Sequence, residues 1–232
     1  RLAKQAYPDL PVVIGGIEGS LRRFAHYDYW NDEVMPSILV DTGADILSYG
    51  MSERQTYEIV TRLAKGEPIS SMTDIPGTCY MTTQDNLPDG YVECAGFNRV
   101  KSDKIAYSKA TRLQMENQDH IKGKILVQKQ TDTMYMVQNP PAKPLSQSEM
   151  DRVYSYPYMR TYHPSYEVLG GVPAIQEVKF SITHNRGCFG ACNFCALAYH
   201  QGRSISVRSH QSVIDEAKKT SDGLINAVKG IF

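Results

Sequence analysis

The sequence lacks an excess of charge of either sign, because its 25 Lys and Arg residues are balanced by 25 Asp and Glu residues. Without such an excess, the chain has no general electrostatic attraction to nucleic acid or to an anionic membrane surface. No apolar run approaches the roughly 20 residues that a membrane-spanning helix needs. We therefore expect partners of neither kind. The 232 residues, of otherwise ordinary composition, suffice for one large domain or two small ones.

Cysteine is also scarce, and three of the five cysteines fall within one short stretch of the chain. Cys188, Cys192 and Cys195 follow the spacing C-x₃-C-x₂-C, which is typical of a metal site rather than of a disulfide framework. A metal site of this kind indicates a reducing compartment, and we predict a cytoplasmic protein. We expect Cys79 and Cys94 to be reduced and partly buried thiols, with a redox pair as the alternative.

Three thiols at this spacing can converge on one metal cluster without a distant fourth protein ligand. Thiolates are soft donors that favour iron–sulfur clusters, zinc or Cu(I) over hard cations. A [4Fe–4S] cluster that is held by only three cysteines keeps one iron open for a further ligand. An open iron distinguishes a reactive cluster from a plain electron carrier.

Zinc is the main alternative metal. His200 stands five residues after Cys195, so that Cys₃His coordination is stereochemically feasible, and His184 is a second candidate ligand. A colourless and redox-silent zinc site would make the chain a binding module. A fourth cysteine ligand, for which Cys79 and Cys94 are the only candidates, would instead indicate an electron-transfer or sensor protein.

The residues around the cysteines closely resemble the radical S-adenosylmethionine (radical SAM) superfamily, in which an aromatic residue, here Phe194, directly precedes the last cysteine. Residues 177–183 predict a strand leading into the cysteine loop, and residues 196–203 predict a helical turn that ends at a glycine. Longer segments are similar to the YgiQ family of uncharacterised bacterial radical SAM proteins. These segments are residues 137–146, 157–164 and 185–190, and the resemblance covers essentially the whole chain.

The resemblance implies a radical SAM enzyme. The three cysteines would each ligate one iron of a [4Fe–4S] cluster, and the amino and carboxylate groups of S-adenosylmethionine would chelate the fourth. One electron from a donor of the flavodoxin or ferredoxin type then cleaves this cofactor into methionine and a 5′-deoxyadenosyl radical, which abstracts hydrogen from a substrate that the sequence does not identify. Phe194 would lie beside the adenine, and no catalytic residue beyond the cluster ligands is predicted.

Apolar runs alternate with helical patterns in the first part of the chain and predict a doubly wound sheet. Residues 11–16 and 44–50 read as strands, residues 33–40 as a helix, and residues 52–64 as a helix that opens with an S-x-x-Q capping box. By resemblance, this part looks like the end of a cobalamin-binding-like Rossmann domain, whose cobalamin-ligating histidine would precede the first residue. Residues 15–19 could hold a ligand, although we favour a simple glycine turn.

The middle of the chain predicts a helix at residues 103–118 and a β-hairpin at residues 125–138. The proline-rich residues 139–144 are expected to be a connector, followed by a capping box at 146–149 that opens a short helix. Residues 154–166 interleave five tyrosines with basic residues, a pattern that could stack on single-stranded nucleic acid. Two prolines and the lack of positive charge favour a tyrosine-rich linker instead.

These patterns predict an α/β protein with three parts. Residues 1–66 form the C-terminal part of a Rossmann or cobalamin-binding-like domain, residues 67–172 a connecting region, and residues 173–232 the first βα unit or units of a radical SAM partial TIM barrel. Ser209 would cap a helix at residues 211–220, and residues 228–232 would begin the second barrel strand. We expect both termini to be cuts, and we expect the segment alone to be inactive although its parent is an enzyme.

Overall fold

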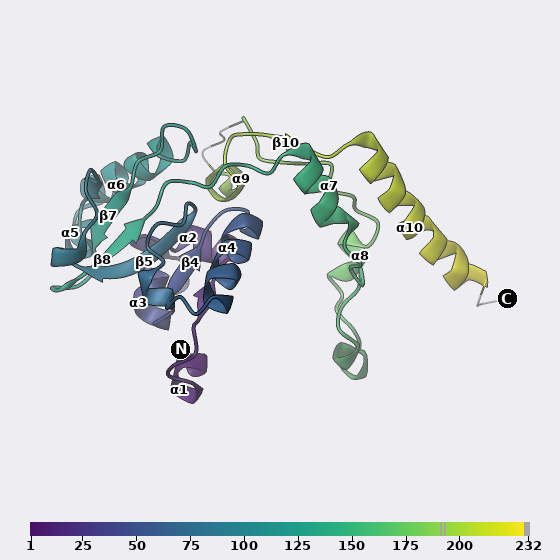
Figure 1. Ribbon diagram of the computed structural model, residues 1–232, viewed down its shortest axis with the longest axis horizontal. Coiled ribbons are helices and arrows are strands. Elements are labelled where there is room, and N and C mark those ends of the chain that lie inside the picture. The colour runs from purple at the N-terminus through teal and green to yellow at the C-terminus, as the bar shows by residue number, and fades with distance from the viewer. Residues whose placement is uncertain (191, 193, 230–232) are drawn as a thin grey trace. The chain divides into compact units, whose positions relative to one another are not determined.

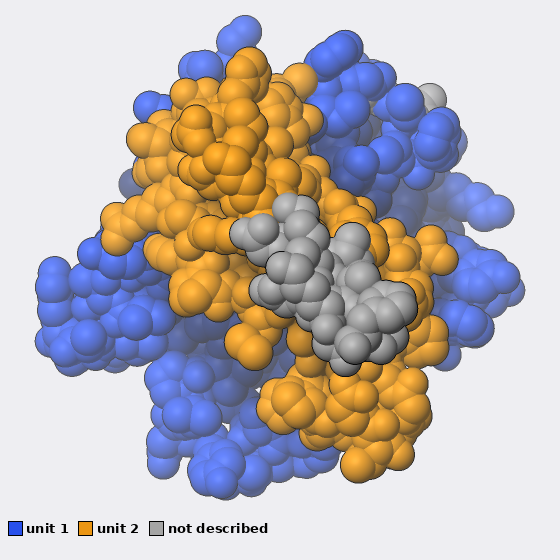
Figure 2. Space-filling view, turned by 90° about the vertical axis from the view of Figure 1, so that its right-hand side faces the viewer, with its two compact units in different colours: residues 1–144, 187–204 blue, residues 145–186, 205–232 orange. Residues whose placement is uncertain are grey.

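The computed structural model describes residues 1–190, 192 and 194–229, and it describes side chains up to residue 220. The chain forms two compact units, which Figure 2 colours separately. Unit 1 comprises Arg1–Pro144 and Gly187–Ser204, and unit 2 comprises Leu145–Arg186 and Ile205–Phe232. The cysteine segment therefore folds with the first 144 residues. The predicted division at residues 66 and 172 stays a prediction.

Unit 1 is built on one six-stranded sheet (Figure 1). In spatial order its strands are β1 (Val13–Ile14), β4 (Ile46–Ser48), β5 (Thr78–Thr83), β8 (Met134–Gln138), β7 (Leu126–Lys129) and β6 (Val92–Cys94). The pairs β1–β4 and β6–β7 are parallel, and the three other pairs are antiparallel. The predicted α/β class with a Rossmann-like sheet is confirmed. The hairpin β7–β8 is confirmed as well, and it extends the sheet.

Helices lie on both faces of this sheet. The described helices of unit 1 are α1 (Leu2–Ala6), α2 (Gly16–Leu21), α3 (Ile38–Thr42), α4 (Glu53–Ala64), α5 (Phe97–Ser102), α6 (Lys104–Glu116) and α9 (Ala196–Gln201), with single turns η1 (Ile69–Ser71) and η2 (Gln84–Asn86). Of these, α1 buries no residue. The helices predicted at residues 52–64 and 103–118 are confirmed as α4 and α6. The glycine-terminated helical turn predicted after the cysteines is confirmed as α9, which ends at Gly202.

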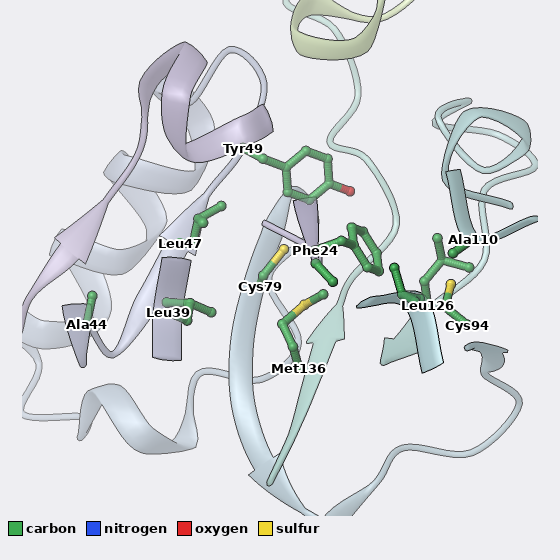
Figure 3. Packing of buried hydrophobic residues seen from close by; sticks show 12 residues of the cluster. Phe24, Leu39, Ala44, Leu47, Tyr49, Cys79, Cys94, Ala110, Leu126 and Met136 are labelled. Carbon is green, nitrogen blue, oxygen red and sulfur yellow. The ribbon is translucent and has the colours of Figure 1, made fainter. Parts of the chain in front are cut away.

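The core lies on both sides of the strands. Leu47, Cys79, Leu126 and Met136 pack on one face with Phe24 (Figure 3). The helices over this face contribute Leu39, Val100 and Ala110. The opposite face is covered in part by α4 and η1 and holds Ile46, Ile59, Met72 and Ile75. Burial on both faces explains why the central strands read as apolar runs rather than as alternating patterns.

The helix predicted at residues 33–40 is wrong in its first half. Residues Glu33–Met35 form β3, which pairs in antiparallel fashion with β2 (His26–Asp28), and α3 begins only at Ile38. Pro36 explains the difference, because a proline disfavours helical backbone angles in the residue before it. Ser37 then caps α3, its side chain accepting a hydrogen bond from the backbone N–H of Leu39.

The capping box predicted at the start of α4 is also wrong. The Ser52 hydroxyl donates to the carbonyl of Gly50 at 3.3 Å, and the buried Gln55 amide donates to the carbonyl of Tyr49 at 3.3 Å. Both side chains therefore bind the preceding loop instead of the helix's own N–H groups. The buried residues of α4 are Gln55 and Ile59.

Three buried glutamines of the β7–β8 hairpin hold irregular backbone against the sheet. Gln128 Oε1 accepts from the backbone N–H of Ala25 at 2.8 Å, and Gln128 Nε2 donates to the Ala95 carbonyl at 2.8 Å. Gln130 Oε1 accepts from the N–H of Ser37 at 2.8 Å. The third, Gln138, binds a buried arginine and is described with the cysteine loop. These amides satisfy backbone groups that would otherwise be buried without partners.

Unit 2 contains mostly short elements. They are α7 (Gln147–Ser155), η3 (Pro164–Leu169), α8 (Ile175–Val178), α10 (His210–Lys229) and the antiparallel pair β9 (Asn185–Arg186) and β10 (Ser206–Val207). The capping box at Ser146 and Glu149 is confirmed. The predicted helix after Ser209 is confirmed as α10, and the Ser209 hydroxyl accepts from the N–H of Ser212 at 3.1 Å.

The strand predicted at residues 177–183 is wrong. Its first two residues belong to α8, and Val178 and Phe180 are 56% and 55% exposed, so the segment has no buried face that would define a strand. Of the strand predicted at residues 228–232, the first two residues belong to α10, and residues 230–232 lie outside the described residues. Within the part that the structure describes, no helix has the length and apolarity needed to cross a membrane.

Candidate metal centre

The cysteine loop of unit 1 is closed by two hydrogen bonds between its two ends. The N–H of Cys188 donates to the carbonyl of Gly202 at 3.2 Å, and the N–H of Gly187 donates to Gln201 Oε1 at 3.0 Å. The last cysteine, Cys195, is the N-cap residue of α9. Short-range closure of this kind keeps the three cysteines on one compact loop.

Two of the three sulfur atoms lie around Gly190. A Cβ at this glycine would be 3.4 Å from the Sγ of Cys188 and 3.8 Å from the Sγ of Cys192. The Gly190 N–H also points to Cys188 Sγ at 3.4 Å. The space between the two sulfurs is therefore free of a side chain at Gly190, which suits a group that soft thiolate donors bind.

All three thiols are accessible, but the described residues do not form a site for a single metal ion. Among the described residues, no three His, Cys, Asp or Glu side chains stand in a metal-binding arrangement. Cys192 is exposed, and Cys188 and Cys195 are half-buried, so all three thiols can reach an incoming ligand. The predicted ligands thus share one accessible loop.

The aromatic residues of the loop face solvent. Phe194 is 92% exposed and Phe189 is 80% exposed. Exposed rings at this position offer apolar surface to a bound cofactor, in line with the role predicted for Phe194, which stays a prediction. By the same resemblance, the small side chain of Ala191 would keep the loop compact, but Ala191 lies outside the described residues.

The other two cysteines cannot serve as a fourth ligand. Both are fully buried in unit 1, and burial raises the pKa of Cys79 and of Cys94 to about 12, so both stay protonated thiols. Strands β8 and β7 lie between their strands, which at about 4.8 Å per strand puts them roughly 14 Å apart (Figure 3). A disulfide is excluded at that separation. The expectation of reduced, buried thiols is confirmed, and the redox pair is excluded.

The two histidines considered as zinc ligands have other contacts. His200 Nδ1 lies 2.8 Å from Ser20 Oγ, and burial lowers its pKa. His184, in unit 2, stacks on His210 with ring centroids 6.3 Å apart. Neither histidine joins the cysteines in a metal-binding group within the described part of the chain.

The glycines after β1 act as a turn that allows close packing. A Cβ at Gly15 would be 3.0 Å from the carbonyl oxygen of Ser48, and Gly16 has a φ of +82°. Only glycine meets both needs without strain. The favoured interpretation of residues 15–19 as a glycine turn is therefore supported.

Sequence reasoning missed the residues that hold α9. Buried Arg23 donates from Nε to Gln138 Oε1 at 2.6 Å, and its guanidinium carbon lies 4.0 Å from the ring centroid of Tyr199 and 4.8 Å from that of Tyr49. The Tyr199 hydroxyl donates to Gln114 Oε1 at 2.5 Å. No local motif marks Arg23, because its contacts come from distant parts of the sequence.

Known proteins resemble this chain over nearly its whole length. The family described as "Radical SAM N-terminal" matches residues 1–181. UPF0313 proteins of two Clostridium botulinum strains, ATCC 19397 and Loch Maree, are each 50% identical over 232 residues, covering 98% of this chain and 36% of theirs. A UPF0313 protein of Clostridium perfringens strain ATCC 13124 is 49% identical over 217 residues, covering 93% of this chain and 33% of its own. The chain thus spans about a third of the length of these relatives. No solved structure matches it.

Proposed function

This chain belongs to the Radical SAM N-terminal family, and from that membership we propose that it is a segment of a radical SAM enzyme, of the YgiQ type, that binds a [4Fe–4S] cluster. Cys188, Cys192 and Cys195 would each ligate one iron. The observation that carries this proposal is the contrast between the cysteines: three accessible thiols share one closed loop, whereas the two others are buried and protonated.

When bound, the cluster would supply the electron for reductive cleavage of S-adenosylmethionine to methionine and a 5′-deoxyadenosyl radical. The residues of the loop would ligate the irons, leave space for the cofactor and cover its adenine. Three cysteine ligands leave one coordination position for the cofactor, and the lack of a side chain at Gly190 keeps the space between two sulfurs open. The exposed ring of Phe194 would cover the adenine.

The wider setting follows from the same proposal. The electron would come from a flavodoxin or ferredoxin type of protein in the cytoplasm, and the substrate is unassigned. Because the chain spans about a third of its relatives, the complete reaction belongs to the whole protein, and the segment alone should cleave little S-adenosylmethionine. Cobalamin binding rests on the resemblance alone.

Two other functions are weaker. A Cys₃His zinc module needs a histidine ligand, but within the described part of the chain neither His200 nor His184 joins the cysteines in a metal-binding group. An electron-transfer or sensor protein with four cysteine ligands needs Cys79 or Cys94. Both are fully buried in the core, and burial raises the pKa of each thiol.

Anaerobic reconstitution with iron and sulfide tests the proposal. We expect a brown protein whose visible absorption bleaches with dithionite. Alanine at any one of the three loop cysteines should abolish the colour, whereas Cys79→Ala and Cys94→Ala are the matched controls that keep it. Stoichiometric zinc in a colourless protein that does not respond to dithionite would favour the binding module.

The cofactor step needs a second measurement. Adding S-adenosylmethionine should change the EPR spectrum of the reduced cluster, and the full-length protein with reductant should yield 5′-deoxyadenosine. An intact, reducible cluster without either response would overturn the enzyme proposal and leave an electron carrier or sensor.

A further inference from the structure

The carboxyl edge of the parallel pair β1–β4 is the place where doubly wound sheets bind ligands. In unit 1 this edge is in contact with α9, which packs against α2 (Figure 1). Ser20 Oγ accepts from the N–H of Gly50 at 3.0 Å and lies 2.8 Å from His200 Nδ1. A Cβ on Gly50 would be 3.3 Å from the carbonyl oxygen of His200. Helix α9 of the same chain therefore occupies the carboxyl edge of β1–β4.

The residue beneath α9 is a buried cation without a carboxylate. Arg23 is 0% exposed, and no acidic side chain of the described residues forms an ion pair with it. Nε donates to Gln138, Nη1 donates to the Ser20 carbonyl, and Nη2 has no hydrogen-bond partner in the described part of the chain. A charge buried in this way is costly, and cation–π contacts with the rings of Phe24, Tyr49 and Tyr199 offset part of the cost.

The ring of Tyr199 is the nearest of these aromatic groups. Burial raises the pKa of Tyr199 to about 12, so the ring is neutral at physiological pH and meets the guanidinium as a cation–π contact. Tyr199 lies four residues after Cys195, about one helical turn along α9. Arg23 thus contacts a residue that lies one helical turn from a predicted cluster ligand.

A helix as short as α9 depends on tertiary contacts for its stability. It has six residues, and isolated helices shorter than about 12 residues are marginal in water. Its buried residue, Ala198, and the contacts of Tyr199 and His200 all lie on unit 1. Removing the contact between Arg23 and Tyr199 should therefore release the arm of the loop that carries Cys195.

We propose that Arg23 is a positioning residue, which docks α9 on the carboxyl edge of β1–β4 through the ring of Tyr199 and so fixes Cys195. The carboxyl edge of β1–β4 then binds the chain's own cysteine segment rather than a nucleotide or another cofactor. The role in cluster binding rests on the proposed function, whereas the docking of α9 does not.

Hydrogen–deuterium exchange on the metal-free chain tests the docking directly. In Arg23→Met and in Tyr199→Leu, amides of residues 196–202 should exchange about tenfold faster, while amides of β5 and β8 stay protected. Tyr199→Phe keeps the ring but loses the hydrogen bond to Gln114 Oε1, so its exchange should be faster than that of the wild type and slower than that of Tyr199→Leu. Arg99→Met, at a side chain that is 73% exposed in the same unit, is the matched control without effect.

The double variant Arg23→Met/Tyr199→Leu separates a shared action from two independent ones. If both residues act through the same contact, the double variant should exchange no faster than the stronger single variant. Unchanged exchange at α9 in both single variants would overturn the proposal. Faster exchange spread evenly over unit 1 would overturn it too, since Arg23 would then be an ordinary core residue. Tyr199→Leu removes the same contact while leaving the buried arginine in place, so it distinguishes loss of the contact from misfolding of the arginine variant.

Cluster loading gives the second readout. After reconstitution, Arg23→Met should bind the cluster about tenfold more weakly than the wild type, as residues that orient metal ligands commonly do when replaced. Wild-type cluster affinity in a variant with a released α9 would overturn the link to Cys195. A wild-type chain that protects α9 but never binds iron would instead contradict the proposed function and leave the docking intact.

Discussion

Arg160 Nη1 lies 2.6 Å from Oε1 of Glu216 in unit 2, and the second oxygen of this carboxylate accepts a hydrogen bond from Arg208. The side chain of Arg208 is 1% exposed and that of Glu216 is 10% exposed, so the carboxylate neutralises a fully buried guanidinium. Removing one partner from such a group leaves the other charge uncompensated. The carboxylate therefore supports the packing of α7 and α10, whose side chains surround Arg208.

Acid should destabilise unit 2 through Glu216. Burial raises the pKa of this carboxyl, but the hydrogen bonds from Arg160 and Arg208 outweigh burial and hold its pKa below the ordinary value. A lowered folded-state pKa means that its stabilisation is present above the unfolded-state pKa of about 4.3 and is lost as pH falls through the folded-state value. Hydrogen exchange of residues 145–186, followed from pH 7 to pH 3, should show this loss.

Glu216→Gln should remove that part of the pH dependence, and at pH 7 it should lower the stability of unit 2 by about 3 kcal/mol. The exposed pair of Arg112 and Glu116 on α6 gives a matched control, because Glu116→Gln should change the stability by less than about 1 kcal/mol. Identical pH profiles below pH 5 for Glu216→Gln and the wild type would contradict the assignment.

The five cysteines should separate into two reactivity classes. At pH 8 a thiol with a pKa of about 12 is roughly 0.01% thiolate, against about a quarter for an ordinary thiol. Iodoacetamide should therefore modify Cys188, Cys192 and Cys195 of the metal-free folded chain quickly, and Cys79 and Cys94 only after denaturant is added. Mass spectrometry of tryptic peptides measures each site. Rapid labelling of Cys79 in the folded chain would show that the core around β5 is open.

Gly190→Ala should lower the amount of cluster that the loop binds. The new methyl group would stand between the Sγ atoms of Cys188 and Cys192, at 3.4 and 3.8 Å. Gly190 does not have a left-handed backbone conformation, so the substitution tests the space between the sulfurs and not backbone strain. Iron and sulfide per chain after reconstitution measure the effect, with circular dichroism as the check on folding. Full cluster content in this variant would mean that the sulfurs rearrange away from Gly190.

Local patterns predicted the parts of the fold that depend on local chemistry. The β7–β8 hairpin and the capping box at Ser146 follow from residues a few positions apart, and both are confirmed. The helix predicted at 33–40 is wrong because Pro36 disfavours helical backbone angles at the residue before it. The capping box at Ser52 is wrong because the Ser52 side chain binds the carbonyl of Gly50 in the preceding loop, which lies outside the S-x-x-Q motif. The cysteine spacing located the candidate ligands by the same local logic.

Contacts between distant segments could not be predicted from the sequence. Arg23 and Gln138 are 115 residues apart, and a single arginine or glutamine is ordinarily read as a surface residue. Their burial follows from the sheet order, which places the end of β8 near the loops after β1 and β4. The docking of α9 by Tyr199 depends on the same order, so it became visible only in three dimensions.

The proline-rich connector, residues 139–144, should be cut by protease only beyond its anchored first residues. Asn139 is 4% exposed; its side chain donates to the carbonyls of Thr73 at 2.9 Å and Ile75 at 3.1 Å, and its carbonyl accepts from the Tyr49 hydroxyl at 2.6 Å. Backbone that is anchored in this way does not fit a protease active site unless it first unfolds. A protease of broad specificity should therefore cut the folded chain between residues 142 and 146, or in the tyrosine-rich stretch, before it cuts between residues 11 and 63.

Asn139→Ala should extend those cuts to residue 139 and lower the stability of unit 1 by about 1–3 kcal/mol, because buried carbonyls lose their donor. Asn86→Ala, at an exposed residue whose side chain donates to Thr83 Oγ1 at 3.0 Å, is the matched control and should leave the cleavage pattern unchanged. Mass spectrometry of the first fragments locates each cut. First cuts within the β1–α4 region would show that this part opens before the connector does, and they would contradict the division of the chain near Pro144.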